Sequence, residues 1–478
     1  MLTFEIIVGF VIAAVSVAVS LFASGHVVLY KRDSRAAIAW AGVIWLAPFL
    51  GTFLYVLLGI NRIERRARLL RTDHSSTDGF MTLKDGPSGL PPETSSNLAQ
   101  LARLIERVTS KELTYGNSIE PLSGGDQAYP VMLAAIRSAQ RTIGLSTYIF
   151  DADDVGFEFA TALAEATKRG VEVRVLIDAV GARYAFSSIV TTLEALDVPV
   201  KTFNPPLLPR RFRYANLRNH RKILTIDGEI AFTGGMNIRS CCCSSNNGEV
   251  TVEDLHFRLS GPIVKQTQDT FTDDWQFAAN EELSGDGWYR ELAATGSCAA
   301  RGIVEGPDLR LDRLRLTLLG ACHCAERSLR IVTPYFLPDA ALISALNVAA
   351  LRGVSVEILI PETSNEKLVQ WACDAQLWQL VERGCQVRET SPPFDHSKFL
   401  IVDDEWVLMG SSNWDPRSLR LNFEFNIESY SRELSSRLNR IFELKKASSK
   451  LVTMEQLNGR SLPVKLRNGV ARLAAPFL

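Results

Sequence analysis

The sequence has almost no net charge, because 52 lysines and arginines are balanced by 53 aspartates and glutamates, for a formal net charge of −1 at pH 7. Such a chain creates no long-range field that would draw it to nucleic acid or to anionic lipid, so any attraction to phosphate must come from local clusters. With 478 residues, 46% of them hydrophobic and 22% charged, the composition is typical of a globular protein with more than one domain.

The sequence also lacks a disulfide framework. Three of its eight cysteines are consecutive, Cys241, Cys242 and Cys243, and a chain of this length needs no cross-links, so we expect mostly reduced thiols. The Cys-His-Cys segment at 322–324 contains half of a zinc-type ligand set. No matching pair lies nearby, and we expect no metal there.

The N-terminus has no basic segment of the kind that opens a signal peptide, and it carries Glu5 instead. Two uncharged apolar runs follow, at 6–23 and 36–60. A bilayer core requires roughly 20 apolar residues per helix, so both runs are long enough to span it. We predict a two-helix transmembrane hairpin over residues 1–60; a buried hairpin of a soluble protein is the alternative.

Basic residues flank both apolar runs. The connection holds Lys31, Arg32 and Arg35, and the second run is followed by five arginines between residues 62 and 71. The flank richer in basic residues stays in the cytoplasm, which predicts a multi-pass membrane protein with the bulk of the chain in the cytoplasm. Residues 72–97 are rich in Ser, Thr, Gly and Pro, and we assign 61–110 to a basic flank and linker.

The rest of the chain alternates helical and strand-like segments. A helical pattern at 157–170 precedes an apolar strand at 171–180, and a second one at 339–353 precedes a strand at 354–362, which predicts an α/β fold. The segments before these helices, 145–153 and 331–340, also match each other. We therefore predict two copies of one unit, at residues 111–295 and 296–478.

A motif of the form H-x-K-x4-D occurs once in each copy, as His220, Lys222 and Asp227 and as His396, Lys398 and Asp403. Asn237 and Asn413 each lie 17 residues after the motif histidine (237 − 220 and 413 − 396). Residues two apart in a strand share a face, so each histidine points the same way as its lysine. Each aspartate has the opposite parity and lies at a predicted turn, and we expect it to support that turn.

These residue types suit a phosphodiester. Lysine supplies a positive charge, asparagine adds donors, and histidine works as a nucleophile or general acid near neutral pH. If two such half-sites face each other, one histidine attacks phosphorus and the other exchanges protons with the leaving and entering alcohols. No metal or cofactor is then needed. A single motif would fit a solvated strand, but two matching copies make that interpretation improbable.

The motif resembles the signature of the phospholipase D superfamily, H-x-K-x4-D followed by G-[GS]-x-N. Four further segments resemble bacterial cardiolipin synthases, at 37–60, 218–228, 411–426 and 471–478. The resemblance implies two α/β units that share one active site and form a phosphatidyl-histidine intermediate. It implies His220 as the nucleophile and His396 as the acid/base.

The resemblance further implies that an acidic residue downstream of each motif orients a histidine. Glu424 is the candidate in the second half and Asp254 in the first. For Asp254 and the neighbouring His256, a solvated strand face is an equally good interpretation. After Ile238 the sequence departs from the family, because it continues with the cysteine run.

Two basic segments fit an anionic lipid surface. The first holds six basic residues: Arg210, Arg211, Arg213, Arg218, Arg221 and Lys222. We expect it to hold lipid headgroups, with a solvated basic loop as the alternative. The second is the tail at 462–478, which suits either the membrane interface or ordinary core packing.

The expected function is phosphatidyl transfer between two phosphatidylglycerol molecules, which gives cardiolipin and glycerol. The expected partners are phosphatidylglycerol and other anionic phospholipids in a bilayer, and not nucleic acid; phosphatidylethanolamine is a further candidate donor. A hydrolytic phospholipase D and an inactive phospholipid-binding protein are the alternatives. Both motifs are intact, which argues against the inactive protein.

Overall fold

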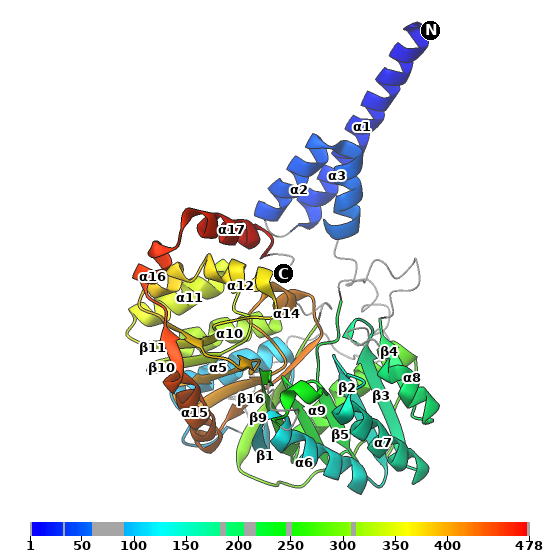
Figure 1. Ribbon diagram of the computed structural model, residues 1–478, viewed down its shortest axis with the longest axis vertical. Coiled ribbons are helices and arrows are strands. Elements are labelled where there is room, and N and C mark those ends of the chain that lie inside the picture. The colour runs from blue at the N-terminus through cyan, green and yellow to red at the C-terminus, as the bar shows by residue number, and fades with distance from the viewer. Residues whose placement is uncertain are drawn as a thin grey trace. The chain divides into compact units, whose positions relative to one another are not determined.

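The computed structural model describes residues 2–31, 34–59, 90–181, 188–204, 217–244, 251–306 and 312–475. Its elements fall into two compact units. The N-terminal unit holds α1 (Leu2–Tyr30), α2 (Ser34–Leu46), α3 (Pro48–Leu54) and the π-helical turn η1 (Tyr55–Gly59), and the larger unit holds all other described elements (Figure 1).

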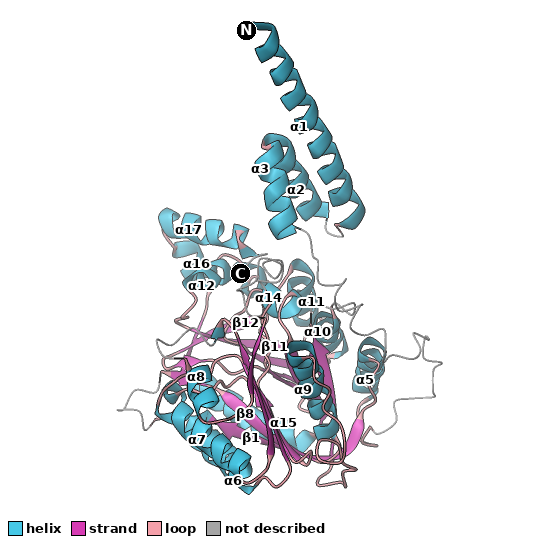
Figure 2. Ribbon diagram, turned by 90° about the vertical axis from the view of Figure 1, so that its right-hand side faces the viewer, coloured by secondary structure: helices cyan, strands magenta, loops and turns pink. Residues whose placement is uncertain are grey.

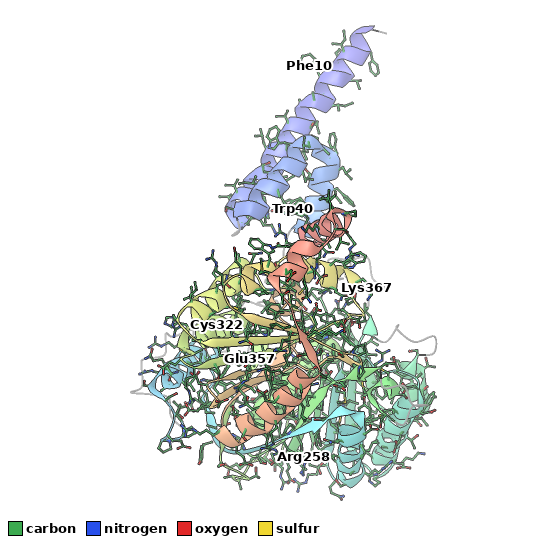
Figure 3. All side chains as sticks on the ribbon, turned by 60° about the vertical axis from the view of Figure 1, so that its left-hand side comes forward. Phe10, Trp40, Arg258, Cys322, Glu357 and Lys367 are labelled. Carbon is green, nitrogen blue, oxygen red and sulfur yellow. The ribbon has the colours of Figure 1, made fainter. Side chains whose placement is uncertain are left out.

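Helix α1 has the properties of a membrane span. Its apolar stretch Ile6–Tyr30 has 25 residues and a mean hydropathy of 2.7, and no other helix among the described residues is both long and apolar enough to cross a membrane. At 1.5 Å per residue it measures about 37 Å, against a hydrocarbon core of about 30 Å. Large apolar side chains project from it along its length, Phe10 among them (Figure 3).

The second apolar run does not form the single helix that we predicted. Helix α2 ends at Leu46, Ala47 leaves the helical conformation with φ −142° and ψ 77°, and α3 begins with Pro48. Proline has no backbone N–H and suits the first position of a helix rather than its interior. At 13 residues, α2 is about 20 Å long and too short for a bilayer core. The two-helix transmembrane hairpin is therefore not confirmed.

Instead, α2 and α3 pack against each other and turn back. A Cβ atom on Gly51 would lie 2.3 Å from the backbone oxygen of Val43, so only glycine permits this approach. Near the end of α1, the His26 Nδ1 atom lies 2.8 Å from the Tyr55 hydroxyl oxygen, and Trp40 packs edge-on against the Tyr55 ring at 5.5 Å. The chain therefore leaves α3 beside the end of α1 at which α2 began.

The larger unit is built on one 15-stranded sheet in which the same strand order occurs twice. The halves meet at the antiparallel pair β1 (Thr114–Ser123) and β9 (Cys298–Glu305). Outward from β1 the first half continues with β8 (Leu255–Ser260), β6 (Ile230–Gly234), β5 (Ile223–Ile226), β2 (Thr142–Thr147), β3 (Glu172–Asp178) and β4 (Val200–Phe203). Outward from β9 the second half continues with β16 (Glu424–Tyr430), β15 (Trp406–Gly410), β14 (Phe399–Val402), β10 (Ser328–Val332), β11 (Ser355–Pro361), β12 (Gln386–Thr390) and β17 (Ser449–Leu451). The predicted α/β fold with a duplicated unit is confirmed.

Helices cover both faces of the sheet (Figure 2). The first half contributes α6 (Gly124–Ser138), α7 (Asp154–Lys168), α8 (Ile189–Ala195), the short η4 (Ser240–Cys242) and α9 (Ile263–Ala279). The second half contributes α10 (Arg313–Cys324), α11 (Ala340–Leu351), α12 (Lys367–Asp374), α13 (Trp378–Val381), α14 (Pro416–Arg420), α15 (Arg432–Ala447), α16 (Met454–Gly459) and α17 (Leu462–Leu473). The crossover helices α7 and α11 begin alike, because Asp153 and Asp339 each accept hydrogen bonds from first-turn amides.

The segment assigned to a linker contains a helix, α5 (Ser96–Thr109). Its apolar side, including Leu98 and Ile105, belongs to the core of the second half. The Ser95 hydroxyl donates to Glu405 at 2.7 Å, and the Asn97 amide donates to the Cys324 carbonyl at 2.7 Å. The folded part of the larger unit therefore includes α5 and begins before residue 111, where we predicted its start. Residues 60–89 lie outside the described residues.

Candidate active site

Each motif histidine precedes a central strand, His220 before β5 and His396 before β14. A parallel bridge joins Asn219 to Phe423, and the short strands β7 (Val252–Glu253) and β13 (Phe394–Asp395) pair in parallel. The His220 amide donates to the Phe423 carbonyl at 2.9 Å, and the His396 amide donates to Glu253 at 2.7 Å. The same local pairing thus occurs twice, each time between the two halves.

This pairing places each histidine beside the acidic residue of the other half. The His220 Nδ1 atom lies 3.1 Å from a Glu424 carboxylate oxygen, and the His396 Nδ1 atom lies 2.7 Å from an Asp254 carboxylate oxygen. Each of the two acids that we named contacts the histidine of the other half, and not the histidine of its own half as we expected. Among the described residues, each motif histidine is therefore paired with a carboxylate of the opposite half.

The carboxylates fix the state of the rings. When Nδ1–H donates to a carboxylate, Nε2 keeps its lone pair, which a nucleophile or base needs. Burial and the charge of Lys398, whose amine lies 2.9 Å from Nδ1, together lower the pKa of His396 to about 4. Burial also lowers the pKa of His220, against the opposing charge of Glu424. Both rings are neutral at pH 7 in the absence of substrate.

The two acids remain ionised. Burial alone would raise the pKa of Glu424, but its interactions with His220 and Lys222 outweigh burial and leave this pKa below its usual value. For Asp254, Lys398 and His396 outweigh burial in the same way. The solvated strand face that we considered for Asp254 and His256 is wrong, because both side chains are buried.

The lysines are the main source of positive charge in the site. The Lys222 amine donates to the carbonyl of His220 at 2.7 Å, and the Lys398 amine donates to the carbonyl of His396. An ammonium group has three donors, so each lysine keeps two for a ligand. Burial lowers the pKa of Lys222 to about 7 and also lowers that of Lys398. An anion bound between them would restore their full charge.

Asn237 and Asn413 each lie shortly after a glycine that packs closely against a neighbouring backbone segment. Gly234 and Gly410 have φ of 153° and 157°, and a Cβ atom there would lie 2.6 Å and 2.4 Å from the backbone oxygens of Leu255 and Phe425, which directly follow the two acidic residues. The Asn237 side-chain oxygen accepts a hydrogen bond from the Ile149 amide at 3.0 Å, which leaves its two N–H donors for another acceptor. Asn413 is buried in the second half.

The position after each glycine explains one difference between the copies. A Cβ atom on Gly235 would lie 2.3 Å from an oxygen of Asp254, so the first half leaves room for that carboxylate. In the second half Ser411 occupies this position and donates to Glu424 at 2.5 Å. The different contacts of the two carboxylates therefore explain why this position is glycine in the first half and serine in the second.

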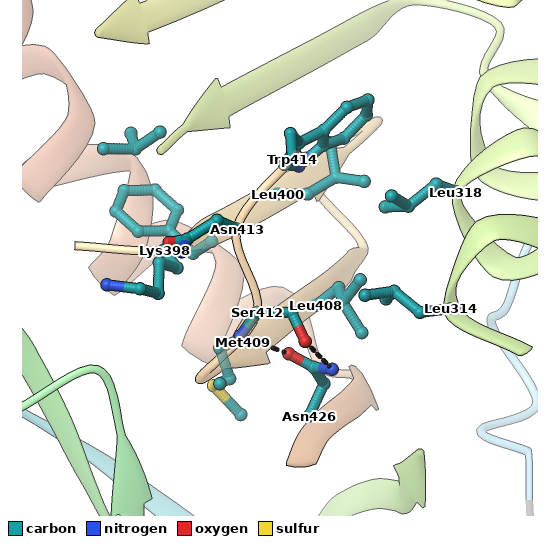
Figure 4. Close-up of a pocket in the computed structure, with 13 residues that line it drawn as sticks. Leu314, Leu318, Lys398, Leu400, Leu408, Met409, Ser412, Asn413, Trp414 and Asn426 are labelled. Atoms are coloured by element: carbon teal, nitrogen blue, oxygen red, sulfur yellow. Dashed lines mark hydrogen bonds between the residues drawn. The ribbon is translucent and has the colours of Figure 1, made fainter. Parts of the chain in front are cut away.

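A small cavity of about 20 Å³ lies behind the second motif strand, lined by Lys398, Asn413 and apolar side chains (Figure 4). Ser412 and Asn426 bond reciprocally beside it, with the amide group of Asn426 donating to the Ser412 hydroxyl at 2.7 Å. The cavity has room for about one water molecule and is too small for a lipid headgroup.

Asp227 and Asp403 lie in turns after the motif strands, each with a left-handed φ, of 53° and 54°. The carboxylate of Asp227 accepts backbone amides of residues 140–142, at 2.7 to 2.9 Å. The carboxylate of Asp403 accepts those of residues 326–328, at 2.7 to 2.9 Å. Both aspartates tie the turn to the start of a neighbouring strand and lie apart from the histidines.

The sequence interpretation missed two tyrosines. The Tyr148 ring lies 5.1 Å from the His220 ring, and the Lys222 amine lies 5.5 Å from the Tyr148 ring centre. Tyr335 lies 6.0 Å from His396 in the other half. Both occur in the segments that we had matched at 145–153 and 331–340, so the repeat itself was the available signal.

The basic segment before the first motif differs from our expectation. Arg221 has only 3% of its surface exposed, forms an ion pair with Asp274, and donates to backbone oxygens of Glu305 and Glu424. Its charge therefore stabilises the fold and does not hold a headgroup. Arg210, Arg211 and Arg213 lie outside the described residues.

The chain is similar to known proteins over most of its length. The family model described as "Cardiolipin synthase, PLD-like domain" matches residues 132–275 and 318–445, and the model described as "Phospholipase_D-nuclease N-terminal" matches 18–59. The chain is 30% identical to a cardiolipin synthase of Geobacillus kaustophilus, over 94% of this chain and 90% of that one. It is also 30% identical to the major cardiolipin synthase of Bacillus subtilis, over 95% and 96%.

Among solved structures, phosphatidylserine synthase of Haemophilus influenzae has a similar fold. Its TM-score is 0.64 at 14% sequence identity, and the match covers 79% of this chain and 100% of that one. At this identity the likeness concerns the fold alone.

Proposed function

The chain belongs to the cardiolipin synthase family of phospholipase D-like proteins, and we propose that it transfers a phosphatidyl group from one phosphatidylglycerol to a hydroxyl of another, releasing glycerol. The observation that carries this proposal is the pair of buried His-Lys sites, each completed by a carboxylate from the opposite half. Mass spectrometry of the lipids that the purified chain forms from phosphatidylglycerol vesicles tests it.

In the first step, the Nε2 atom of His220 attacks phosphorus and the bond to the glycerol oxygen breaks. His396 gives its proton to the leaving alkoxide, so glycerol departs neutral and the phosphatidyl group remains on His220. In the second step, His396 takes the proton of the acceptor hydroxyl. The acceptor oxygen attacks phosphorus, and the bond to His220 breaks, which restores both rings.

The other site residues support these steps. Lys222, Lys398, Asn237 and Asn413 hold the non-bridging phosphoryl oxygens as charge develops on them. Glu424 and Asp254 orient the two rings and stabilise their protonated states. The free His396 is neutral, but a bound phosphodiester anion offsets the charge of Lys398 and raises the histidine pKa, which lets it act as an acid.

We also propose that the two halves, 111–295 and 296–478, act as one catalytic unit and not as separate enzymes. Support comes from the crossed carboxylates and from the continuous sheet across β1 and β9. Helix α5 also belongs to the second half, because it packs into the core of that half although it precedes the first half in the sequence.

For the membrane anchor we propose one span, α1, followed by an α2–α3 pair that enters and leaves on the side where α1 ends. The contact between His26 and Tyr55 supports this arrangement. It places Lys31 and Gly59, the last described residue of the anchor, on one side. Because arginines follow soon after Gly59 in the sequence, the positive-inside rule assigns this side to the cytoplasm. A two-span hairpin would place these two basic flanks on opposite sides.

Cysteine labelling in sealed membranes tests this topology. We expect Lys31→Cys and Lys168→Cys, on the exposed end of α7, to react from the same side with a membrane-impermeant maleimide, and Thr3→Cys from the other side. The unsubstituted chain, whose cysteines are buried or half-buried, gives the background. Labelling of positions 31 and 168 from opposite sides would establish the two-span hairpin instead.

The pKa of Lys222 predicts the alkaline limb of the pH profile. Lysine is charged below its pKa, so kcat/KM, which reports the free enzyme, is expected to fall as the pH rises above about 7. Lys222→Arg keeps its charge throughout this range, so its alkaline limb should move to higher pH even if its maximal rate is lower. An unchanged alkaline limb in Lys222→Arg would assign that limb to another group.

A further inference from the structure

Helix α17 exposes an apolar stripe. Its members are the large apolar residues with the highest exposure on this helix: Leu462 at 69%, Leu466 at 61%, Val470 at 67% and Leu473 at 76%. Spacings of four, four and three residues place them within an arc of about 80° on a helical wheel. The stripe therefore runs the whole length of the helix.

The opposite face of α17 is fixed to the catalytic unit. Asn468 and Ala471 are buried, and Ala471 packs with Leu337 and Ala372. The guanidinium of Arg467 lies 4.4 Å from the ring centre of Trp371 on α12. Because this face is already packed, the stripe cannot rotate inward to cover itself.

The charges on α17 are of one sign. The helix contains Lys465, Arg467 and Arg472 and no acidic residue. Arg467 is held against Trp371, so the charges offered to lipid headgroups are Lys465 and Arg472, which lie together on one side of the stripe on the helical wheel. An apolar stripe flanked by long basic side chains is the pattern of a helix lying in the interface of an anionic bilayer, with the charged ends reaching the headgroups.

The buried side of α17 contacts the segment that carries a site residue. Leu337, against which Ala471 packs, follows Tyr335 by two residues (337 − 335), and the Tyr335 ring lies 6.0 Å from His396. The Leu337 amide also donates to the carbonyl of Trp414, the residue after Asn413, at 2.7 Å. Helix α17 is therefore one layer of packing away from the second half-site.

We propose that α17 is an interfacial helix, and that its stripe of Leu462, Leu466, Val470 and Leu473 inserts among the lipids of an anionic bilayer. The basic residues beside the stripe select an anionic lipid surface over an uncharged protein partner. This contact is additional to the anchor α1, and it holds the catalytic unit itself at the membrane surface. It does not depend on which reaction the site performs.

A polarity-sensitive fluorophore on Leu466→Cys, in the full chain reconstituted into phosphatidylglycerol-containing vesicles, tests the contact without turnover. The matched control is Leu444→Cys, which is 73% exposed on α15, a helix well away from α17 in both ribbon views. We expect the probe at 466 to report an apolar environment and to be quenched by nitroxide-labelled acyl chains, and the probe at 444 to remain in water.

Two other outcomes would overturn the proposal. If both probes report water, the stripe is simply solvent-exposed. If the probe at 466 is shielded but acyl-chain nitroxides do not quench it, a protein surface such as a second copy of the chain covers the stripe. The unsubstituted chain carried through the same labelling corrects for native thiols.

The same contact has a functional consequence. We expect Leu466→Ser with Val470→Ser to lower turnover of vesicle phosphatidylglycerol by about tenfold, and to leave turnover of a water-soluble short-chain analogue within about twofold. Leu444→Ser should change neither. Equal losses on both substrates would mean that the helix only stabilises the fold. Full activity of the Leu466→Ser, Val470→Ser double variant on vesicles would also refute the proposal.

Discussion

Replacement of His220 or His396 by alanine is expected to lower turnover by about 10⁴-fold or more, because each ring carries a step that no other described side chain in the site can perform. Because each histidine contacts a carboxylate of the other half, we expect either replacement to abolish the function of the whole site. His220 is completed by Glu424 and His396 by Asp254, so neither half can retain a working site alone. Turnover of phosphatidylglycerol in reconstituted vesicles measures the effect.

The control for these variants is His323→Ala. His323 is exposed on α10, outside the site, and its replacement should leave activity and membrane insertion unchanged. Substantial activity in either His220→Ala or His396→Ala, with intact insertion, would contradict a site shared between the halves.

A substrate with an activated leaving group separates the two roles. The nitrophenyl ester of phosphatidic acid releases a weakly basic phenolate that needs no proton, so loss of the acid is tolerated in the first step. We expect His396→Ala to release about one equivalent of nitrophenol per site and to retain the phosphatidyl group on His220, as intact-protein mass spectrometry would show. His220→Ala should give no such burst. A burst in His220→Ala and none in His396→Ala would exchange the assignments.

Much of this site could be predicted from spacing alone. Strand parity places His220 and Lys222 on one face, and the equal offsets to Asn237 and Asn413 identify the repeated unit. The partners of Glu424 and Asp254 could not be predicted in this way. Spacing shows which residues belong to a half, but the β7–β13 pair and the Asn219–Phe423 bridge, which join the halves, decide which histidine each acid faces.

The second apolar run shows a different limit. Hydropathy measures how apolar a segment is, and a spanning helix and a folded helical pair have the same composition. The local signal was the proline at position 48, which suits a helix start and disfavours a helix interior. The closeness of Gly51 to Val43, which makes the reversal possible, depends on tertiary packing and is not visible in the sequence.

The tail was ambiguous for a related reason. The segment at 462–478 is amphipathic, and amphipathic periodicity identifies an apolar face without showing whether protein or lipid covers it. In the structure, the small residues Asn468 and Ala471 form the packed face, and the large apolar residues point outward. A surface helix usually buries its large apolar residues, whereas α17 exposes them and buries small residues instead.

The acceptor in the second step determines the product. A phosphatidyl-histidine can react with water, at about 55 M in bulk solvent, or with a lipid alcohol that the site holds in place; a well-oriented group can reach an effective molarity of about 10⁵ M. The motif histidines and lysines are buried or nearly buried, which limits access of bulk water. We therefore expect cardiolipin and glycerol as the main products from phosphatidylglycerol, with phosphatidic acid as a minor one.

The reverse reaction follows from the same step. The transfer exchanges one phosphodiester for another with little net change in free energy, so added glycerol should drive cardiolipin back to phosphatidylglycerol through the same histidine. The measurement is lipid mass spectrometry on vesicles with and without glycerol, and with His220→Ala as the inactive control. Mainly phosphatidic acid, in an amount that glycerol does not change, would show that water is the acceptor and that the chain is a hydrolase. Because α17 would bring either enzyme to the bilayer, that outcome would leave the proposed interfacial helix unaffected.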